Sequence, residues 1–223
     1  MNSESGLGIK GSEPTSTRLV ATLGLAGLLS GLIIVAVYEA TLPTITEYKA
    51  KVLKEAVFKV LPSISSMQPL TYRDGKMIPA GGDEDEEDLV FGGYDADGRL
   101  VGYAIPNAGP GFQDTIRLLY GLLPQERRVV GMEILQSRET PGLGDKIYKD
   151  LAFVANFDAL AIDPEIVTVK KGSRSAPNEV DAITGATISS KAVVQIINRG
   201  NQRWLQRLED APATATPADA GGG

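Results

Sequence analysis

The N-terminal part of the chain contains an apolar segment, residues 19–37, without a single charged side chain. A helix of about 20 such residues crosses the hydrocarbon core of a bilayer, since each residue advances the helix by about 1.5 Å. Arg18 precedes the segment, and Tyr38 follows it at a position where aromatic side chains often lie in the membrane interface. The segment therefore predicts one transmembrane helix, residues 18–40, in a chain that is divided between lipid and water.

A cleavable signal peptide is the alternative to a membrane anchor. The apolar segment is longer than the usual core of a signal peptide, and Tyr38 and Glu39 do not form a small-residue cleavage site. Lysines and arginines flank both ends of the segment, so their distribution does not decide its orientation. We expect the short tail before the segment to be retained and the large C-terminal part to be exported.

The remainder of the chain has the pattern of an α+β domain with mainly antiparallel strands. Strands are expected in five apolar or alternating segments, residues 89–94, 100–105, 115–120, 129–135 and 166–170. The Asp-Ala-Asp-Gly sequence between the first two of these strands predicts a hairpin turn. Residues 71–82 are expected to form a loop or hairpin, and the acidic run at residues 83–88 a solvated loop rather than a metal site.

Helices are predicted by apolar residues at helical spacing and by end signals. Residues 44–47 read Thr-Ile-Thr-Glu, a capping box that predicts the start of a helix, and Pro62 ends this helix. Two more helices are expected, at residues 151–160 and 188–208, the second with Gly200 as a point of interruption. The predicted organisation is a flexible tail at 1–17, the transmembrane helix at 18–40, a connector helix at 41–62, a domain at 63–210 and a disordered tail at 211–223.

The composition excludes several classes of chemistry. Among its 223 residues the chain has no cysteine and no histidine. Thiolate zinc sites, cysteine-ligated iron–sulfur clusters, haem with a His or Cys ligand, and nucleophiles that need a histidine are therefore excluded. The formal net charge is −6 and no basic stripe is present, so nucleic-acid binding is not expected. Redox chemistry in this chain would have to come from an organic cofactor.

A phosphate-binding pattern lies near the C-terminal end. Residues 181–189 read Asp-Ala-Ile-Thr-Gly-Ala-Thr-Ile-Ser and lead into the last predicted helix. The first turn of a helix offers unpaired N–H groups and the positive end of the helix dipole, and small residues let a phosphate approach them. A threonine hydroxyl there could bind a phosphate or be esterified to it. The alternative is an ordinary helix cap, with Thr184 or Thr187 as the capping residue.

A second pattern follows the strand expected at residues 129–135. Residues 139–146 read Glu-Thr-Pro-Gly-Leu-Gly-Asp-Lys, in which a proline and two glycines favour a shaped, exposed loop. Glu139 and Thr140 offer a hydrogen-bond acceptor and a donor, and Leu143 offers an apolar surface for a flat ring. The alternative is an ordinary loop after a strand.

Together these segments resemble the FMN-binding domain of the G subunit of Rnf electron-transport complexes. That family is related to the C subunit of the sodium-translocating NADH:quinone reductase. Its members join FMN through the phosphate to the last threonine of the motif Asp-x-x-(Ser/Thr)-Gly-Ala-Thr. This motif is matched at every defined position by Asp181, Thr184, Gly185, Ala186 and Thr187, so the resemblance assigns the attachment to Thr187.

Other parts of the chain extend the resemblance to roughly residues 19–208. The Glu-Thr-Pro-Gly-Leu-Gly loop is matched in full by residues 139–144, and residues 111–121 also resemble the family. One departure is Ser137, where members often carry a histidine, which puts a proton relay at that position in doubt. Besides Thr187, the expected FMN contacts are Thr184, Gly185, Ala186, Ser189, Ser190, Lys191, Glu139, Thr140, Gly142 and Leu143.

The resemblance implies a single-pass electron-carrier subunit of the cytoplasmic membrane, with the FMN domain on the extracytoplasmic side. Its partners would be the other subunits of a translocase that couples electron transfer between ferredoxin and NAD to ion transport. A separate flavin transferase would attach FMN from FAD, and Asp181 would belong to its recognition motif. Two alternatives stay open, namely the C-type subunit of the quinone reductase and a membrane-anchored binding module without redox chemistry.

Overall fold

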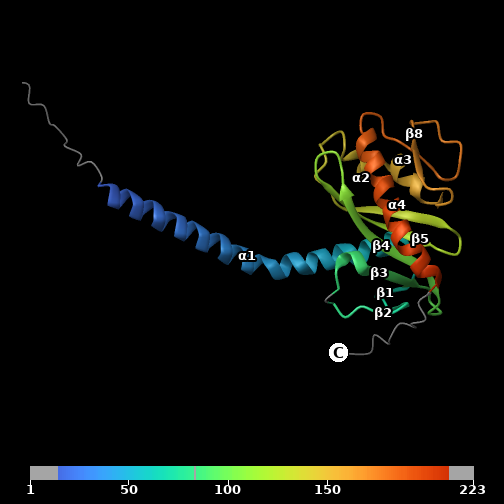
Figure 1. Ribbon diagram of the computed structural model, residues 1–223, viewed down its shortest axis with the longest axis horizontal. Coiled ribbons are helices and arrows are strands. Elements are labelled where there is room, and N and C mark those ends of the chain that lie inside the picture. The colour runs from blue at the N-terminus through green and yellow to red at the C-terminus, as the bar shows by residue number, and fades with distance from the viewer. Residues whose placement is uncertain (1–14, 83, 211–223) are drawn as a thin grey trace, which may run out of the picture. The chain divides into compact units, whose positions relative to one another are not determined.

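The computed structural model describes residues 15–82 and 84–210 (Figure 1). The chain divides into two compact units, Met1–Ala50 and Lys51–Gly223. Helix α1 (Ser16–Val60) begins in the first unit, where its most apolar stretch has a mean hydropathy of 2.4 and no buried residues. Within the described part of the chain it is the one helix that is long and apolar enough to cross a membrane. The predicted N-terminal tail lies outside the described residues up to position 14, and the tail at 211–223 lies outside them entirely.

The predicted helix start at Thr44 is wrong, because α1 continues through Pro43 without a break. A capping box stabilises the first turn of a helix because the N–H groups of that turn lack backbone partners. Residues 44–47 lie inside α1, where the preceding turn of the helix supplies carbonyl acceptors. The hydroxyl of Thr46 instead bonds back to the carbonyl oxygen of Leu42 at 3.0 Å. The predicted end is close to the observed one, since α1 ends at Val60, two residues before Pro62. The division of these residues between a span and a connector stays a prediction.

An antiparallel sheet of seven strands forms the centre of the second unit, in the order β2-β1-β3-β4-β5-β6-β7 among the described residues. Residues 74 and 75, Asp-Gly, both have positive φ and form the tight turn of the first hairpin. All five predicted strands are confirmed, four of them in this sheet. The strands are β1 (Ser66–Arg73), β2 (Lys76–Pro79), β3 (Leu89–Tyr94), β4 (Leu100–Pro110), β5 (Thr115–Leu123), β6 (Arg128–Gln136) and β7 (Leu160–Ala161).

The two faces of the sheet pack against different helices. Alternate residues of β5, such as Leu118 and Tyr120, belong to a core that α4 (Thr187–Asp210) covers (Figure 1), while Leu119 between them belongs to a second core. The last turns of α1, with Val57 and Val60 buried, cover that second face. The approach is close at Gly121, where a Cβ atom would lie 2.2 Å from the carbonyl oxygen of Val60. The α+β class with mainly antiparallel strands is confirmed.

Helix α4 is one continuous helix, so the interruption predicted at Gly200 is absent. A Cβ atom at this position would lie 2.3 Å from the hydroxyl oxygen of Tyr120, so the glycine permits close packing against β5. The acidic run before β3 forms ion pairs with the C-terminal part of α4. Glu87 forms an ion pair with Arg203 at 2.9 Å, and Asp88 forms one with Arg207 at 3.6 Å.

A smaller layer of short elements lies between β6 and α4 in the sequence. It consists of α2 (Lys146–Lys149), α3 (Leu151–Val154), the 3₁₀ helix η2 (Ala155–Phe157), and a parallel pair of strands, β8 (Val167–Val169) and β9 (Glu179–Asp181). The predicted helix at residues 151–160 is therefore too long. The side-chain amide of Asn156 donates to the carbonyl oxygens of Ala152 and Phe153. These bonds compete with the backbone N–H groups that would bond to the same oxygens in a longer helix. Neither α2 nor β9 was predicted.

Candidate functional site

A tight turn connects β9 to α4 and presents Thr187 at the start of the helix. The backbone N–H of Ala186 donates to the carbonyl oxygen of Ile183 at 3.0 Å and closes this turn. Gly185 has a φ of 83°, a conformation that glycine adopts without strain. Thr184 and Thr187 on either side of the turn are both exposed.

Ser190 fixes the turn from inside the domain. Its hydroxyl accepts from the backbone N–H of Ile183 at 3.1 Å and donates to the carbonyl oxygen of Ala186 at 2.9 Å. The side chain is fully buried, at 0% exposure. Ser190 therefore holds the turn that precedes Thr187, and its hydroxyl is turned away from solvent.

Glu139 joins the second predicted segment to the first. One carboxylate oxygen accepts from the backbone N–H groups of Phe112 and Gln113 at 2.9 and 3.0 Å. The other accepts from the hydroxyl of Ser189 at 2.5 Å. The hydroxyl of Thr140 donates to the side-chain oxygen of Gln113 at 3.0 Å. The structure thus brings together three segments that are distant in sequence.

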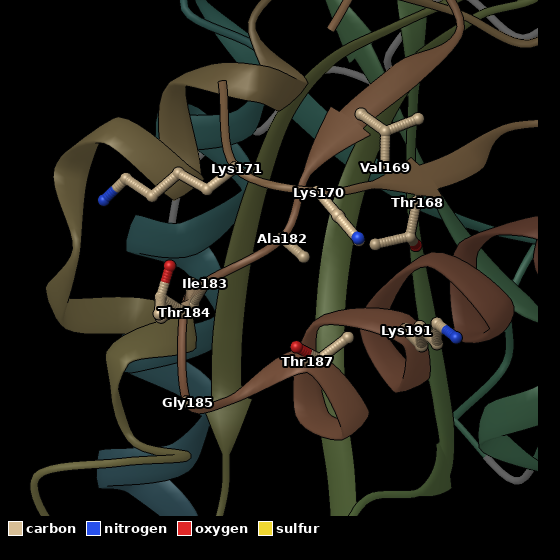
Figure 2. Close-up of a pocket in the computed structure, with 10 residues that line it drawn as sticks. All are labelled: Thr168, Val169, Lys170, Lys171, Ala182, Ile183, Thr184, Gly185, Thr187 and Lys191. Atoms are coloured by element: carbon tan, nitrogen blue, oxygen red, sulfur yellow. The ribbon is translucent and has the colours of Figure 1, made fainter. Parts of the chain in front are cut away.

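An open pocket of about 450 Å³ lies beside the turn (Figure 2). Figure 2 shows Thr187 in the first turn of α4, with Lys170 projecting from the end of β8. The pocket combines two exposed hydroxyls with three lysines. Its lining residues are Thr168, Val169, Lys170, Lys171, Ala182, Ile183, Thr184, Gly185, Thr187 and Lys191.

Exposed apolar side chains adjoin the same turn. Leu143 is 50% exposed, and one of its methyl carbons lies 3.8 Å from the position that a Cβ atom would take on Gly185. Ile188, the residue after Thr187, is 58% exposed, and Phe112 in the loop held by Glu139 is 63% exposed. Thr187 therefore lines a cationic pocket, and exposed apolar side chains lie near the same turn at Leu143 and Ile188. This arrangement suits a ligand with a phosphate at one end and a flat ring at the other.

Comparison with known proteins now places the chain in a family. A family model described as an FMN-binding domain matches residues 111–202. The G subunit of the Na(+)-translocating ferredoxin:NAD(+) oxidoreductase complex from Acetobacterium woodii is 31% identical over 169 residues, which cover 73% of this chain and 78% of that protein. The chain belongs to the family of G subunits of ion-translocating oxidoreductase complexes, the Rnf family. The G subunit of the ion-translocating oxidoreductase complex from Methanosarcina acetivorans is 29% identical over 187 residues, 82% of this chain and 90% of that protein.

Solved structures support the fold. The C subunit of the Na(+)-translocating NADH-quinone reductase from Parabacteroides distasonis has a TM-score of 0.55 and 20% identity, covering 73% of this chain and 95% of that one. NqrC from Shewanella oneidensis has a TM-score of 0.54 and 20% identity, covering 72% and 99%. At this identity the likeness concerns the fold alone.

Apart from Gly142, the predicted FMN contacts of this chain fall into two groups in the structure. Thr184, Gly185, Thr187 and Lys191 line the pocket, and Leu143 adjoins it. The second group consists of buried or hydrogen-bonded residues that support the site from within, namely Glu139, Thr140, Ala186, Ser189 and Ser190. Gly142 is exposed with a φ of 79° at the tip of its loop. All of them stay predictions as FMN contacts.

The side chain of Asp181 forms hydrogen bonds with the backbone of a neighbouring loop. Its carboxylate accepts from the backbone N–H groups of Ser173 and Arg174, both at 3.2 Å, and its own N–H donates to the side-chain oxygen of Asn156 at 3.1 Å. The first residue of the motif thus holds the loop at residues 173–174 and is itself held by Asn156. Its place in recognition by a transferase stays a prediction.

Three polar lining residues were missed by the sequence prediction, namely Thr168, Lys170 and Lys171. They reach the pocket because β8 pairs in parallel with β9, with Val169 opposite Asp181. The predicted strand at residues 166–170, followed by Lys-Gly, was visible in the sequence. Nothing in the sequence pattern placed that strand beside the Asp-x-x-Thr motif.

Proposed function

We propose that this protein is the membrane-anchored, electron-carrying subunit of an Rnf-type complex and holds FMN covalently, through its phosphate, on the hydroxyl oxygen of Thr187. The observation that carries this proposal is the exposed Thr187 hydroxyl, which lies in the first turn of a 24-residue helix and lines a pocket with three lysines. Such a helix start favours an anion, and ammonium groups add to that preference.

The residues of the site fit FMN at both ends. Lys170, Lys171 and Lys191 would surround a phosphodiester on Thr187, and Leu143 and Ile188 would offer apolar contact to the ring. Bound FMN would supply one- or two-electron transfer, which the chain's own side chains do not provide. The buried Glu139 would fix the loop that carries Leu143 relative to the helix that carries Thr187.

Attachment requires a nucleotide donor, since a hydroxyl and FMN alone lack a leaving group. With FAD as donor, the oxygen of Thr187 bonds to the phosphorus of the FMN half, the phosphoanhydride bond breaks, AMP leaves, and the hydroxyl proton is released to solvent. Among the described residues that line the pocket of Thr187, there is no carboxylate that could accept the hydroxyl proton. We therefore assign this step to a separate flavin transferase that recognises residues 181–187.

The apolar part of α1 would anchor the protein in the cytoplasmic membrane as a single span, with the FMN domain on the extracytoplasmic side. The relatives named above are subunits of ferredoxin:NAD(+) or ion-translocating oxidoreductase complexes, so the partners of this chain would be the other subunits of such a complex. Electrons would then pass between the FMN and cofactors in those subunits, coupled to ion transport.

Fluorescence on a denaturing gel tests the covalent link. The full chain is co-expressed with a flavin transferase, and its band is viewed under ultraviolet light. We expect a fluorescent band for the wild type and for Thr187→Ser, and none for Thr187→Ala. Thr184→Ala is the matched control, because it removes the other exposed hydroxyl of the turn. A fluorescent Thr187→Ala band would move the attachment elsewhere, and a dark wild type would reject a covalent flavin.

A further inference from the structure

An exposed phenylalanine lies in the loop between β4 and β5. All five phenylalanines of the chain are among the described residues, and Phe112 alone of them is exposed, at 63%. Pro110 pairs with Thr115, so residues 111–114 form a short hairpin loop that contains Phe112. A phenyl ring gains free energy when it leaves water, and loops on a rigid scaffold carry a large share of binding residues. The position of Phe112 therefore indicates contact with a ligand.

Hydrogen bonds hold the loop of Phe112 in a defined conformation. The backbone N–H of Gly111 donates to the carbonyl oxygen of Asp114 at 2.9 Å, which closes the loop. The N–H groups of Phe112 and Gln113 both donate to one carboxylate oxygen of Glu139. A Cβ atom on Gly111 would lie 2.5 Å from that oxygen, so the loop and the carboxylate are in close contact. The exposed phenyl ring is thus carried by a backbone with hydrogen bonds at three consecutive residues.

The same carboxylate connects Phe112 with the helix turn that carries Thr187. The other oxygen of Glu139 accepts from the hydroxyl of Ser189, which follows Thr187 by two residues in the first turn of α4. Two hydrogen bonds to one carboxylate therefore join the backbone of Phe112 to this turn. Leu143, on the loop that follows Glu139, adjoins the same region and is also exposed. Exposed apolar side chains thus lie on each of the segments that meet at Glu139.

We infer that Phe112 contacts the isoalloxazine ring of FMN and shields the ring from water. This inference rests on the proposed function, which attaches the phosphate of FMN to Thr187. The ribityl chain of FMN separates its ring from its phosphate, so side chains outside the turn at Thr187 must bind the ring. A phenyl ring offers a flat apolar face to another ring, and aromatic pairs prefer offset or edge-to-face contact. Phe112 is absent from the FMN contacts that the sequence predicted.

Flavin fluorescence of the folded protein tests this contact. The full-length protein is co-expressed with a flavin transferase and purified in detergent, and its emission per flavin is measured before and after denaturation. An indole in contact with a flavin quenches the emission by donating an electron to the excited ring, which a phenyl ring does not do. Phe112→Trp should therefore emit severalfold less than the wild type when folded, and should regain the emission in denaturant.

Ala96→Trp is the matched control for the added indole. Ala96 is exposed in the turn between β3 and β4, at the opposite end of β4 from Phe112, so this variant should emit as the wild type does. Iodide gives a second readout that needs no indole. Phe112→Ala removes the shield, so iodide should quench the flavin of this variant with a larger Stern–Volmer constant than the flavin of the wild type.

Either of two results overturns the inference. One is a folded Phe112→Trp protein that emits as strongly as the wild type, and the other is an unchanged iodide quenching in Phe112→Ala. If Phe112→Ala loses other subunits of the complex on purification while its flavin emission and iodide quenching are unchanged, the phenyl ring binds a partner protein and the inference fails. These results, obtained on chains that fluoresce on a denaturing gel, reject only the role of Phe112. A wild type without flavin on that gel rejects the proposed function and this inference with it.

Discussion

The carboxylate of Glu139 accepts a 2.5 Å hydrogen bond from the hydroxyl of Ser189, 50 residues further along the chain. Its other oxygen accepts from two backbone N–H groups, those of Phe112 and Gln113. The side chain is 5% exposed, so these three donors take the place of water. One buried carboxylate thereby connects the loop before β5, the loop after β6 and the first turn of α4.

Replacing Glu139 with alanine should destabilise the domain by about 1–3 kcal/mol, because two backbone N–H groups and a hydroxyl lose their acceptor. Glu139→Gln should cost less, since its amide oxygen can still accept from the two N–H groups. Urea denaturation of the full-length protein, followed by tryptophan fluorescence, measures both changes; Trp204 is buried on α4 and is the one tryptophan of the chain. Equal stability of the alanine variant and the wild type would show that this carboxylate does not connect the three segments.

Gly185→Ala should reduce both stability and flavin attachment. A Cβ atom at this position would have 3.8 Å to its nearest neighbour, the side chain of Leu143, so no collision occurs. The cost comes from the φ of 83°, and it is about 1–2 kcal/mol for a residue with a Cβ atom. Gly185→Asn should be milder, because asparagine adopts positive φ more readily. If denaturation places the alanine variant above the asparagine variant in stability, the described turn conformation is wrong.

Gly121→Ala tests the packing of α1 on the sheet. The added methyl group would lie 2.2 Å from the carbonyl oxygen of Val60, so the end of α1 must shift. Overpacking of this kind costs about 1–3 kcal/mol, and the backbone partner places this variant at the upper end. Gly81→Ala is the matched control, because its methyl group would meet only the side chain of Glu84 at 3.6 Å. A thermal midpoint unchanged in Gly121→Ala would contradict this packing.

The pair formed by Asp145 and Lys149 predicts a loss of stability in acid. The hydrogen bond from Lys149 lowers the pKa of Asp145 below its ordinary value of 3.8. A carboxyl group with a lowered pKa stabilises the fold above its unfolded pKa, and this contribution disappears as the pH falls through its folded pKa.

Asp145→Asn should therefore be less stable than the wild type at about pH 6, and the difference should shrink as the pH falls below about 4. Urea denaturation across this pH range measures the difference, with the exposed Asp158→Asn as the matched substitution. A difference between Asp145→Asn and the wild type that is constant with pH would show that the pair does not form.

The sequence was sufficient for four strands of the central sheet, because their segments are apolar or alternating and are joined by recognisable turns, as at Gly98. Strands β1 and β7 were not predicted. The sequence also placed Thr187 at the start of the last helix. It could not place Lys170 and Lys171 in the pocket, because the parallel pairing of β8 with β9 depends on contacts between distant residues. The supporting roles of Ser190 and Glu139 could not be predicted either, because they also depend on contacts between distant residues. From the sequence alone, a hydroxyl or carboxylate in a motif is interpreted as a ligand contact, since its burial is not known.

Mass spectrometry of the peptide that contains Thr187 tests the central claim most directly. The full-length protein, co-expressed with a flavin transferase, is digested and its peptides are fragmented. The covalent link predicts that the peptide carries the mass of an FMN moiety joined with loss of water, and that the fragments place this mass on Thr187. A peptide of unmodified mass, or a flavin located on Thr184 or Ser189, would contradict the assignment of Thr187.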